Sequence, residues 1–231
     1  MRYAWSGQPP LLRDFSLDIQ PGAITAIVGP SGSGKSTLLR LAAHLLSPAE
    51  GRVEAASERT AFVFQSPNLL PWRTVRDNVA LPLQLQGTPR AQRRQQAEAI
   101  LARVGLADAG LALPGALSGG MKMRASLARA LVTEPGALLM DEPFSSLDTF
   151  TRRQMHAEFL GLWQRARPTV LLVTHDLEEA TVLADRVVLV AGRPLQVVRD
   201  DAVPLPRPRA RHDSAVVSIV RGLEQAMEAA A

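Results

Sequence analysis

The sequence predicts an α/β fold with a mainly parallel sheet and an inserted helical subdomain. Short apolar runs rich in β-branched residues alternate with runs of helical composition on both sides of the middle of the chain. That alternation is typical of parallel strands joined by helices. The middle of the chain is instead rich in Ala, Gln, Arg and Leu and poor in β-branched residues. Because the strand-like runs are almost wholly apolar, we expect both faces of the sheet to be covered.

The first predicted strand and the first predicted helix flank a glycine-rich turn. Ala23–Gly29 is an apolar run bounded by Pro21-Gly22 and Gly29-Pro30, which predicts a short buried strand. Ser36–Leu46 contains no Gly or Pro and has helical composition. A strand, a glycine-rich turn and a helix in this order form one half of a nucleotide-type α/β unit.

The helical middle of the chain interrupts the alternation of strands and helices. Arg90–Gly105 predicts one amphipathic helix, and its apolar side carries Ile100, Leu101 and Val104. We therefore expect a single domain. Its α/β core would comprise about residues 1–73 and 132–231, and its helical subdomain about residues 74–131.

Strands and helices alternate again after the helical subdomain. The strand-like runs are Ala137–Met140, Thr169–Thr174 and Val187–Val190, and the helix-like runs between them are Thr151–Arg167 and Leu177–Ala184. In the longer of the two helices we expect four core residues: Met155, Phe159, Leu162 and Trp163. Pro204–Arg211 is rich in Pro and Arg and predicts irregular structure, and the last ten residues predict a weak, fraying helix.

The composition is that of a globular domain and excludes several other classes of protein. The chain has 231 residues, of which 46% are hydrophobic and 21% charged, and this excludes an intrinsically disordered chain. The absence of Cys excludes a disulfide scaffold, a thiolate zinc site and a cysteine nucleophile. No apolar run is long enough to span a membrane, and the first ten residues lack the apolar core of a signal peptide. The net charge is +4 and the Arg residues are dispersed, which favours a solvated surface over a nucleic-acid interface.

The glycine-rich turn fits the phosphate-loop pattern Gly-x4-Gly-Lys-Ser. Glycine allows successive backbone N–H groups to turn inward and approach a phosphate closely, and the following helix adds its dipole. In this motif the lysine reaches the β- and γ-phosphates and the serine hydroxyl binds Mg²⁺. The predicted phosphate-binding residues are Gly29, Pro30, Ser31, Gly32, Ser33, Gly34, Lys35, Ser36 and Thr37.

Two carboxylates follow the apolar run ALLM. Asp141 and Glu142 end a predicted strand, and the carboxyl ends of strands are where ligands bind in open α/β folds. In phosphate-loop ATPases an aspartate at this place holds the Mg²⁺ shell, so we assign that role to Asp141. We expect Glu142 to polarise the attacking water.

Leu117-Ser118-Gly119-Gly120-Met121 opens a third candidate site. Alone, Ser-Gly-Gly indicates a turn or a helix N-cap. Because the helix Met121–Val132 is predicted to follow, its N-terminus together with Ser118, Gly119 and Gly120 also forms a possible phosphate-binding surface.

These three elements, in this order, resemble the ATP-binding-cassette (ABC) family of ATPases. The resemblance extends from Tyr3 to about Asp185 and is specific because of the signature LSGGM. Gln65 matches the Q-loop glutamine, Ser145-Ser146-Leu147-Asp148 matches the D-loop, and His175 matches the switch histidine that contacts the γ-phosphate.

The resemblance implies a phosphate-loop NTPase (RecA-like) core with an antiparallel β portion near the N-terminus. It also implies that the cofactors are ATP and Mg²⁺, with the metal held by Ser36, Gln65 and Asp141. The catalytic residues it implies are Lys35, Gln65, Glu142 and His175. Either Tyr3 or Trp5 is the aromatic residue expected to stack on adenine, and of the two we favour Tyr3.

The chain departs from the family pattern at two positions. Met121 stands where many members carry Gln, and Ser66 stands where related chains often carry an acidic residue. Since Ser118 and the glycine backbone can contact a phosphate without a glutamine amide, we expect the first departure to preserve phosphate binding.

The implied partners are a second copy of the chain and a membrane transporter. In the family, Ser118–Gly120 serve ATP bound to the opposite chain of a head-to-tail homodimer. Within the family, LLPWRTVRDNVALPLQLQG and LSGGMKMRASLARALV are similar to the importer ATPases for nitrate, taurine, aliphatic sulfonates and thiamine-precursor pyrimidines. That similarity implies integral-membrane permease subunits, a periplasmic or lipid-anchored substrate-binding protein, and a location on the cytoplasmic face of the inner membrane.

The segment Asn68–Trp72 is the candidate contact with the permease. It contains Asn68, Leu69, Leu70, Pro71 and Trp72. Leu69 and Leu70 could equally be buried packing residues, whereas we expect Trp72 to be exposed. The alternative functions are a non-transport ABC ATPase of DNA repair, chromosome organisation or translation, a phosphate-loop kinase or GTPase, and a catalytically inactive cassette. Non-transport ABC ATPases typically carry a long coiled-coil insertion, a Cys zinc module or a second cassette. The sequence shows none of these features.

Overall fold

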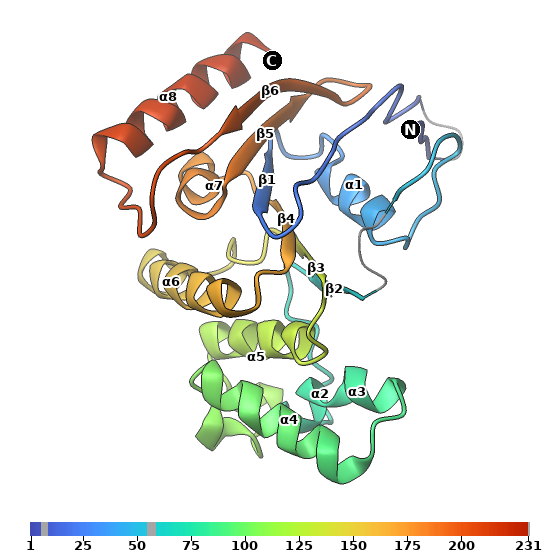
Figure 1. Ribbon diagram of the computed structural model, residues 1–231, viewed down its shortest axis with the longest axis vertical. Coiled ribbons are helices and arrows are strands. Elements are labelled where there is room, and N and C mark those ends of the chain that lie inside the picture. The colour runs from blue at the N-terminus through green and yellow to red at the C-terminus, as the bar shows by residue number, and fades with distance from the viewer. Residues whose placement is uncertain (6–8, 55–58, 231) are drawn as a thin grey trace. The chain divides into compact units, whose positions relative to one another are not determined.

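In the computed structural model, which describes residues 1–5, 9–54 and 59–230, the chain forms two units that are interleaved in sequence. The first unit comprises residues 1–56 and 169–231, and the second comprises residues 57–168. Figure 1 labels the helices and strands of both units.

The first unit is built on a sheet with β1 at its centre. β1 (Ile24–Val28) is parallel to β4 (Thr169–Val173) on one side and to β5 (Arg186–Ala191) on the other. β6 (Gln196–Ala202) extends the sheet as an antiparallel partner of β5. Every residue of β1 is buried, as expected for an apolar strand between two neighbours.

Three helices accompany this sheet. α7 (Leu177–Leu183) packs against β1 and β5, and α8 (Ser214–Ala229) packs against α7, β5 and β6. α1 (Lys35–Ala42) contacts β4 and lies on the other side of the sheet from α7 and α8 (Figure 1). The α/β fold with a mostly parallel sheet is therefore confirmed.

Three details of this unit differ from the sequence prediction. α1 ends at Ala42 rather than Leu46, because the chain turns at His44, which has a positive φ of 55°. The strand β6 was not predicted, since most of its residues are exposed and show no apolar alternation. A helix was predicted for the last ten residues, but α8 begins earlier, at Ser214, has 16 residues and is held by buried Val216, Val220 and Leu223.

Among the described residues near the N-terminus, antiparallel pairing takes the form of isolated bridges. Arg2 pairs with Glu50 and Tyr3 pairs with Leu12, both in the antiparallel sense. The full antiparallel strand pair is β5 and β6, at the other end of the sequence.

The second unit combines two parallel strands with helices. The strands are β2 (Thr60–Val63) and β3 (Ala137–Asp141). The helices are α2 (Val75–Val79), α3 (Leu81–Leu85), α4 (Arg90–Arg103), α5 (Gly119–Leu131) and α6 (Thr149–Ala166), with short 3-10 turns at Ala107–Ala109 and Pro114–Ala116.

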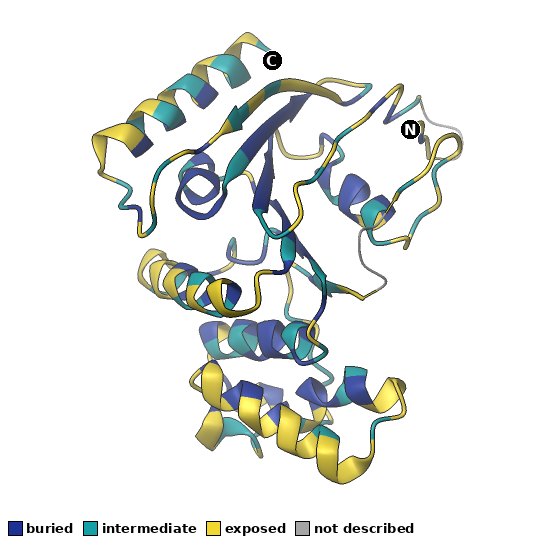
Figure 2. Ribbon diagram, in the orientation of Figure 1, coloured by how far each residue is buried: buried dark blue, intermediate teal, exposed yellow. Residues whose placement is uncertain are grey.

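The helices α2 to α5 share a hydrophobic cluster that extends from Val75 to Val132. Its largest contributions from α4 are Ile100 and Leu101, as the amphipathic pattern predicted, while the rest of that helix is mostly exposed (Figure 2). On α6, Met155, Phe159 and Trp163 are buried and Leu162 packs against the same cluster. Within the described ranges, no helix has the length and apolarity to cross a membrane.

Candidate functional site

The loop between β1 and α1 has a backbone that only glycine permits at its first residue. A Cβ added to Gly29 would lie 2.1 Å from the carbonyl oxygen of Val190 on β5. At the other end, Gly34 adopts a left-handed conformation with φ 112° and is the N-cap of α1. An L side chain is disfavoured there by its backbone conformation alone. The glycines thus bring the loop backbone close to β5 and turn it sharply into the helix.

The loop is shaped to receive an anion. The N-cap Gly34 offers no side-chain hydrogen bond to the first turn of α1, and that turn contains no acidic residue. The leading N–H groups of a helix and its dipole favour negative charge. Within the described residues, the buried Oγ of Ser33 has no hydrogen-bond partner. An orphaned hydroxyl and an uncapped helix start in one glycine-rich loop fit a triphosphate.

Lys35 lies over this loop. The residue is 4% exposed, and its Nζ donates to the carbonyl oxygens of Gly29 and Pro30, at 2.8 Å each. The ammonium group is therefore placed inside the predicted phosphate-binding turn. Thr37 is also buried, and Ser36 stands between them at the start of α1.

His175 is placed at the same edge of the sheet as the phosphate loop. It follows β4, which is parallel and adjacent to β1, so the carboxyl ends of the two strands meet there. His175 is exposed, whereas the preceding Thr174 is buried and its Oγ1 accepts from the Asp176 N–H at 3.1 Å. Asp176 in turn caps α7 by accepting from the Glu179 N–H at 2.9 Å. The histidine is thus held between a strand end and a helix cap.

The second unit brings the predicted carboxylates and the Q-loop glutamine together. Asp141 is the last residue of β3 and is buried, and Gln65 follows the neighbouring parallel strand β2. Ser145 connects Gln65 to Glu142, the residue after Asp141: its Oγ accepts from Gln65 Nε2 at 3.3 Å and donates to the Glu142 carbonyl oxygen at 2.8 Å. The ends of the adjacent strands β2 and β3 therefore assemble one polar group.

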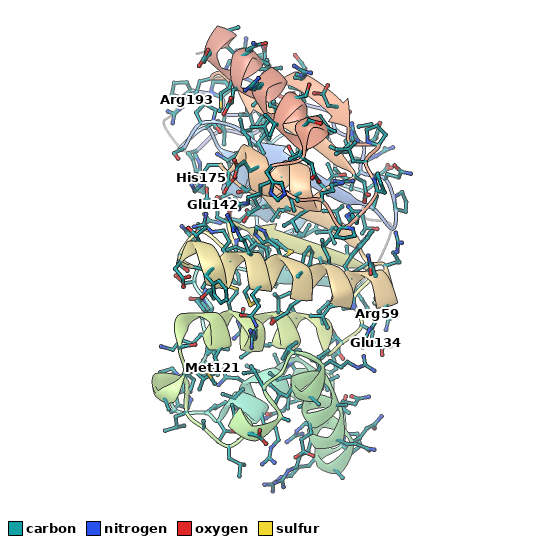
Figure 3. All side chains as sticks on the ribbon, turned by 90° about the vertical axis from the view of Figure 1, so that its left-hand side faces the viewer. Arg59, Met121, Glu134, Glu142, His175 and Arg193 are labelled. Carbon is teal, nitrogen blue, oxygen red and sulfur yellow. The ribbon has the colours of Figure 1, made fainter. Side chains whose placement is uncertain are left out.

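Glu142 has an unusual backbone conformation. Its φ is 44°, in the left-handed region that a residue with a Cβ rarely adopts (Figure 3 labels its side chain). Hydrogen bonds from the N–H and Oγ of Ser145 to the Glu142 carbonyl oxygen secure this turn. Residues held in sparsely populated conformations cluster at active sites, where the surrounding structure fixes them.

The D-loop is fixed at both of its ends. Asp148 is the N-cap of α6, where its Oδ1 accepts from the N–H groups of Phe150 and Thr151 at 3.0 Å. A hydrogen bond from the Thr151 side chain, together with those from the Thr151 and Phe150 N–H groups, holds the pKa of the Asp148 carboxyl below its usual value. Arg152 donates to the carbonyl oxygens of Ser145 and Leu147.

The signature segment begins α5. Ser118 is its N-cap, and Ser118 Oγ accepts from the Met121 N–H at 3.3 Å. The cap uses the backbone of Met121, while the Met121 side chain packs against the hydrophobic cluster of the helical segment. Ser118 and Gly119 are exposed, whereas Gly120 is buried. Thr151 lies so close to Gly120 that a Cβ on Gly120 would be 2.8 Å from Thr151 Cγ2. Replacement of the usual Gln by Met therefore leaves the exposed start of α5 intact.

The two candidate adenine-stacking residues are in contact with each other. Tyr3 and Trp5 form an edge-to-face pair with ring centroids 5.4 Å apart. Tyr3 is 7% exposed, whereas Trp5 is 40% exposed. Because a buried ring offers no free face for stacking, the burial favours Trp5 over Tyr3.

Comparison with known proteins decides the family. The sequence profile described as "ABC transporter" matches residues 12–145. The chain belongs to this family. The predicted resemblance is confirmed, and with it the expected class of activity, an ABC ATPase.

Similar proteins of the ABC family include import subunits of bacteria. The chain is 52% identical to the aliphatic sulfonates import ATP-binding protein of Mycobacterium avium (strain 104) over 204 residues, which covers 88% of this chain and 80% of that protein. It is 45% identical to the taurine import ATP-binding protein of Chromobacterium violaceum over 223 residues, with coverage of 93% and 85%.

A solved structure of the family agrees with the fold. The ATP-binding cassette MJ0796, in a dimeric post-hydrolysis state bound to ADP and Pi, superposes with a TM-score of 0.74 at 29% identity. The match covers 89% of this chain and 96% of that one. Dimeric arrangement is therefore present among structural neighbours of this ABC ATPase.

Sequence reasoning missed the residues that hold the Q-loop segment of this ABC ATPase. Arg129 on α5 donates to the carbonyl oxygens of Pro67 and Asn68, at 2.7 and 2.6 Å. Burial lowers the pKa of the Arg129 guanidinium. Asn78, fully buried on α2, donates to three carbonyl oxygens and accepts from the N–H of Leu70. An arginine and an asparagine on helices carry no sequence signal for bonds to the backbone of a loop.

The candidate permease contact, Asn68–Trp72, contains both a packed and an exposed apolar residue. Leu69 packs against the hydrophobic cluster of the helical segment, while Trp72 is 73% exposed. The predicted exposure of Trp72 is confirmed. A third residue missed from the sequence is Arg193, in the turn between β5 and β6 (Figure 3), whose guanidinium donates to the Gly32 carbonyl oxygen at 2.9 Å.

Proposed function

We propose that this ABC ATPase is the nucleotide-binding subunit of an importer for a small sulfonate-type solute, such as taurine or an alkanesulfonate. Identities of 45–52% to sulfonate and taurine import ATP-binding proteins, over most of both chains, support this class. The observation that carries the ATPase role is the glycine-rich loop with the buried Lys35 and the uncapped start of α1.

ATP would be held by the phosphate loop, Gly29 to Thr37. Lys35 is placed to neutralise the β- and γ-phosphates, and the N–H groups of the loop and of α1 supply further donors. Mg²⁺ would be held by Ser36, Gln65 and Asp141, whose hydroxyl, amide and carboxylate oxygens suit this hard cation. When bound, Mg²⁺ neutralises charge that develops on the transferred phosphoryl group. Of the two aromatic candidates, burial leads us to assign adenine stacking to Trp5.

Glu142 would take the role of general base or water-orienting group. The backbone of Glu142 is fixed by Ser145, which also binds Gln65. A displacement of one of these three residues on ligand binding would therefore be passed on to the other two. His175 would contact the γ-phosphate from the sheet edge that carries the phosphate loop. Positioned proton transfer of this type contributes about 10²–10⁴-fold to rate.

Hydrolysis would require two copies of the chain. The exposed Ser118 and Gly119, with Gly120, would serve ATP bound to the opposite chain of a head-to-tail homodimer. Integral-membrane permease subunits would contact the segment Asn68–Trp72 through the exposed Trp72, and a periplasmic or lipid-anchored binding protein would deliver the solute. The subunit would then act peripherally at the cytoplasmic face of the inner membrane, and we expect no nucleic-acid partner.

The hydrolytic assignment is tested with Glu142→Gln. We expect steady-state ATPase activity to fall by about 10²–10⁴-fold while ATP binding persists. Lys35→Ala is the complementary variant, and a fluorescent ATP analogue should show its loss of nucleotide affinity. Unchanged turnover in Glu142→Gln would remove Glu142 from the role, and wild-type affinity in Lys35→Ala would contradict the loop assignment.

The transport assignment is tested in proteoliposomes that contain the subunit with its permease and binding protein. We expect taurine or an alkanesulfonate to stimulate ATP hydrolysis, and nitrate to serve as the comparison solute. Stimulation by nitrate alone would move the substrate class to another branch of the importers. Salt-dependent retention on DNA with no solute response would favour a non-transport ABC ATPase.

A further inference from the structure

The segment Pro204–Arg211 lies along α7, the helix that follows His175. It joins β6 to α8 without regular structure, and its sequence PLPRPRAR places arginines at alternate positions. Each of these arginines bonds to α7 or to a residue that flanks it. We call Arg207, Arg209 and Arg211 the arginine clamp.

Arg209 is the buried centre of the clamp. It is 8% exposed, and its guanidinium donates to the carbonyl oxygens of Thr181 and Ala184 at 2.8 and 2.5 Å. It also donates to the carbonyl oxygens of Val203 and Leu205 in its own segment. The last carbonyl groups of a helix lack intrahelical partners and favour a positive charge. Burial, with the neighbouring charge of Arg207, lowers the pKa of Arg209 to about 10, so the group stays charged at neutral pH.

Arg207 connects the end of α7 to the strand that precedes the phosphate loop. Its guanidinium donates to the Leu183 carbonyl oxygen and to Asp185 Oδ1, both at 2.6 Å. The other carboxylate oxygen of Asp185 accepts from the N–H of Ile24, the first residue of β1, at 2.9 Å. The C-terminal end of α7 is therefore fixed relative to β1.

Arg211 acts at the opposite end of α7, next to the histidine. One guanidinium nitrogen donates to Glu178 Oε2 at 2.9 Å. The other lies 3.8 Å from Asp176 Oδ2 and, within the described part of the chain, is a buried nitrogen with no hydrogen-bond partner. Asp176 caps α7 and directly follows His175 in the sequence. Arg211 therefore attracts the residue adjacent to the histidine.

We propose that the arginine clamp positions α7, and that Arg211 is a positioning residue for His175 in ATP hydrolysis. The inference rests on the proposed role of His175 at the γ-phosphate. Arg207 and Arg209 fix the C-terminal end of α7. Arg211 places a positive charge beside Asp176 and Glu178 at its N-terminal end. The C-terminal segment thereby adjusts a catalytic group from outside the nucleotide-binding motifs.

The two ends of the clamp differ in what their loss changes. Partly exposed ion pairs such as Arg211–Glu178 contribute little to folding stability. A buried guanidinium that satisfies several carbonyl groups, as Arg209 does, is a structural requirement. Substitution of Arg211 should therefore change turnover without changing the melting temperature, which separates a positioning role from a merely structural one.

The test measures kcat, the KM for ATP and the melting temperature of the full chain for Arg211→Ala, Arg211→Lys and Arg221→Ala. Arg221 is an exposed arginine on α8 and serves as the matched control. For Arg211→Ala we expect kcat to fall by about 2- to 30-fold, the range by which remote positioning residues alter coupling. We expect its KM to stay within about twofold and its melting temperature within about 3 °C of wild type. Arg211→Lys should recover most of kcat, and Arg221→Ala should match wild type.

His175→Ala, measured beside these variants, separates the inference from the function on which it rests. Loss of turnover in His175→Ala with wild-type kcat in Arg211→Ala overturns the inference alone. Normal turnover in His175→Ala overturns the role of the histidine and the inference with it. A fall in kcat for Arg211→Ala that is matched by a fall in melting temperature and is not recovered by lysine also overturns the positioning role.

Discussion

The phosphate loop and the arginine clamp both join a strand to a helix without regular structure, and they are held in place by different means. In the phosphate loop the backbone itself approaches β5, and Lys35 reaches back to carbonyl groups only five and six residues away. In the clamp, arginine side chains also reach carbonyl and carboxylate groups 22 to 33 residues away, beyond the local bonds of Arg209 to Val203 and Leu205.

This difference explains why one segment is recognisable in a sequence and the other is not. A conformation determined by glycine and by near neighbours leaves a fixed local pattern. A conformation determined by distant carbonyl groups requires only an arginine of sufficient reach, and any strand or helix end supplies the carbonyls. The following predictions test how sharply the two segments differ, beginning with the variant expected to lose ATP binding altogether.

Gly29→Ala should disrupt the phosphate loop most strongly. The new Cβ would lie 2.1 Å from the Val190 carbonyl oxygen, so the strand or the loop must move. Overpacking of this kind costs roughly 1–3 kcal/mol or more. We expect a lower melting temperature and loss of ATP binding, measured by thermal denaturation and by titration with a fluorescent ATP analogue.

Gly32→Ala is the matched control for steric contact. A Cβ at Gly32 would meet no atom within 4 Å, and only its positive φ of 74° opposes an alanine. That conformation costs about 1–2 kcal/mol. An equal or larger loss of stability at Gly32 would show that close approach to β5 does not determine the loop.

Arg209→Met should destabilise the first unit through the clamp. Methionine retains apolar volume but leaves the carbonyl groups of Thr181 and Ala184 buried without their arginine donor. Each buried group left unsatisfied costs about 1–3 kcal/mol, and we therefore expect a loss of about 3 kcal/mol or more in urea unfolding. The same change at the exposed Arg221 should leave stability within about 0.5 kcal/mol of wild type. Similar unfolding curves for the two variants would contradict a structural role for the clamp.

Asp185 should make the clamp sensitive to acid. Burial raises the pKa of the Asp185 carboxyl, but hydrogen bonds from Arg207 and from the Ile24 N–H, with the charges of Arg207 and Arg209, lower it below its usual value overall. A depressed pKa in the folded state means that the unfolded chain binds the proton more readily. The stabilisation is therefore complete above the ordinary pKa of aspartate and is lost as the pH falls through the folded pKa.

The Asp185→Asn variant tests this sign. We expect it to melt below wild type at pH 7, because the ion pair is absent, and the difference should shrink as the pH falls toward 3. Thermal denaturation across this range is the measurement. A difference that grows toward acid would mean that the carboxyl destabilises the folded chain.

Local pattern determined most of what could be predicted about the fold and the candidate site. Apolar runs predicted β1 and β3 nearly to the residue, whereas Gln65 was linked to Asp141 only by the family resemblance, because β2, the strand before Gln65, was not predicted. The strand β6 escaped prediction because it pairs at the edge of the sheet with most of its residues exposed. Arg129 and Arg209 escaped because their partners are backbone carbonyl groups, which have no sequence signature.

Arg193→Ala should have the smallest effect of these substitutions. It tests directly whether the phosphate loop depends on a distant arginine, as α7 does. Arg193 is exposed, and its guanidinium donates to the phosphate loop at the Gly32 carbonyl oxygen, 2.9 Å away and 161 residues earlier in the chain. A single hydrogen bond of this kind contributes about 0.5–1.5 kcal/mol, so ATP affinity should fall by no more than about tenfold. Titration with the fluorescent ATP analogue, beside Lys35→Ala, measures it. If Arg193→Ala lost binding as completely as Lys35→Ala, the phosphate loop would depend on a distant arginine just as α7 does, and the distinction between the two segments would fail.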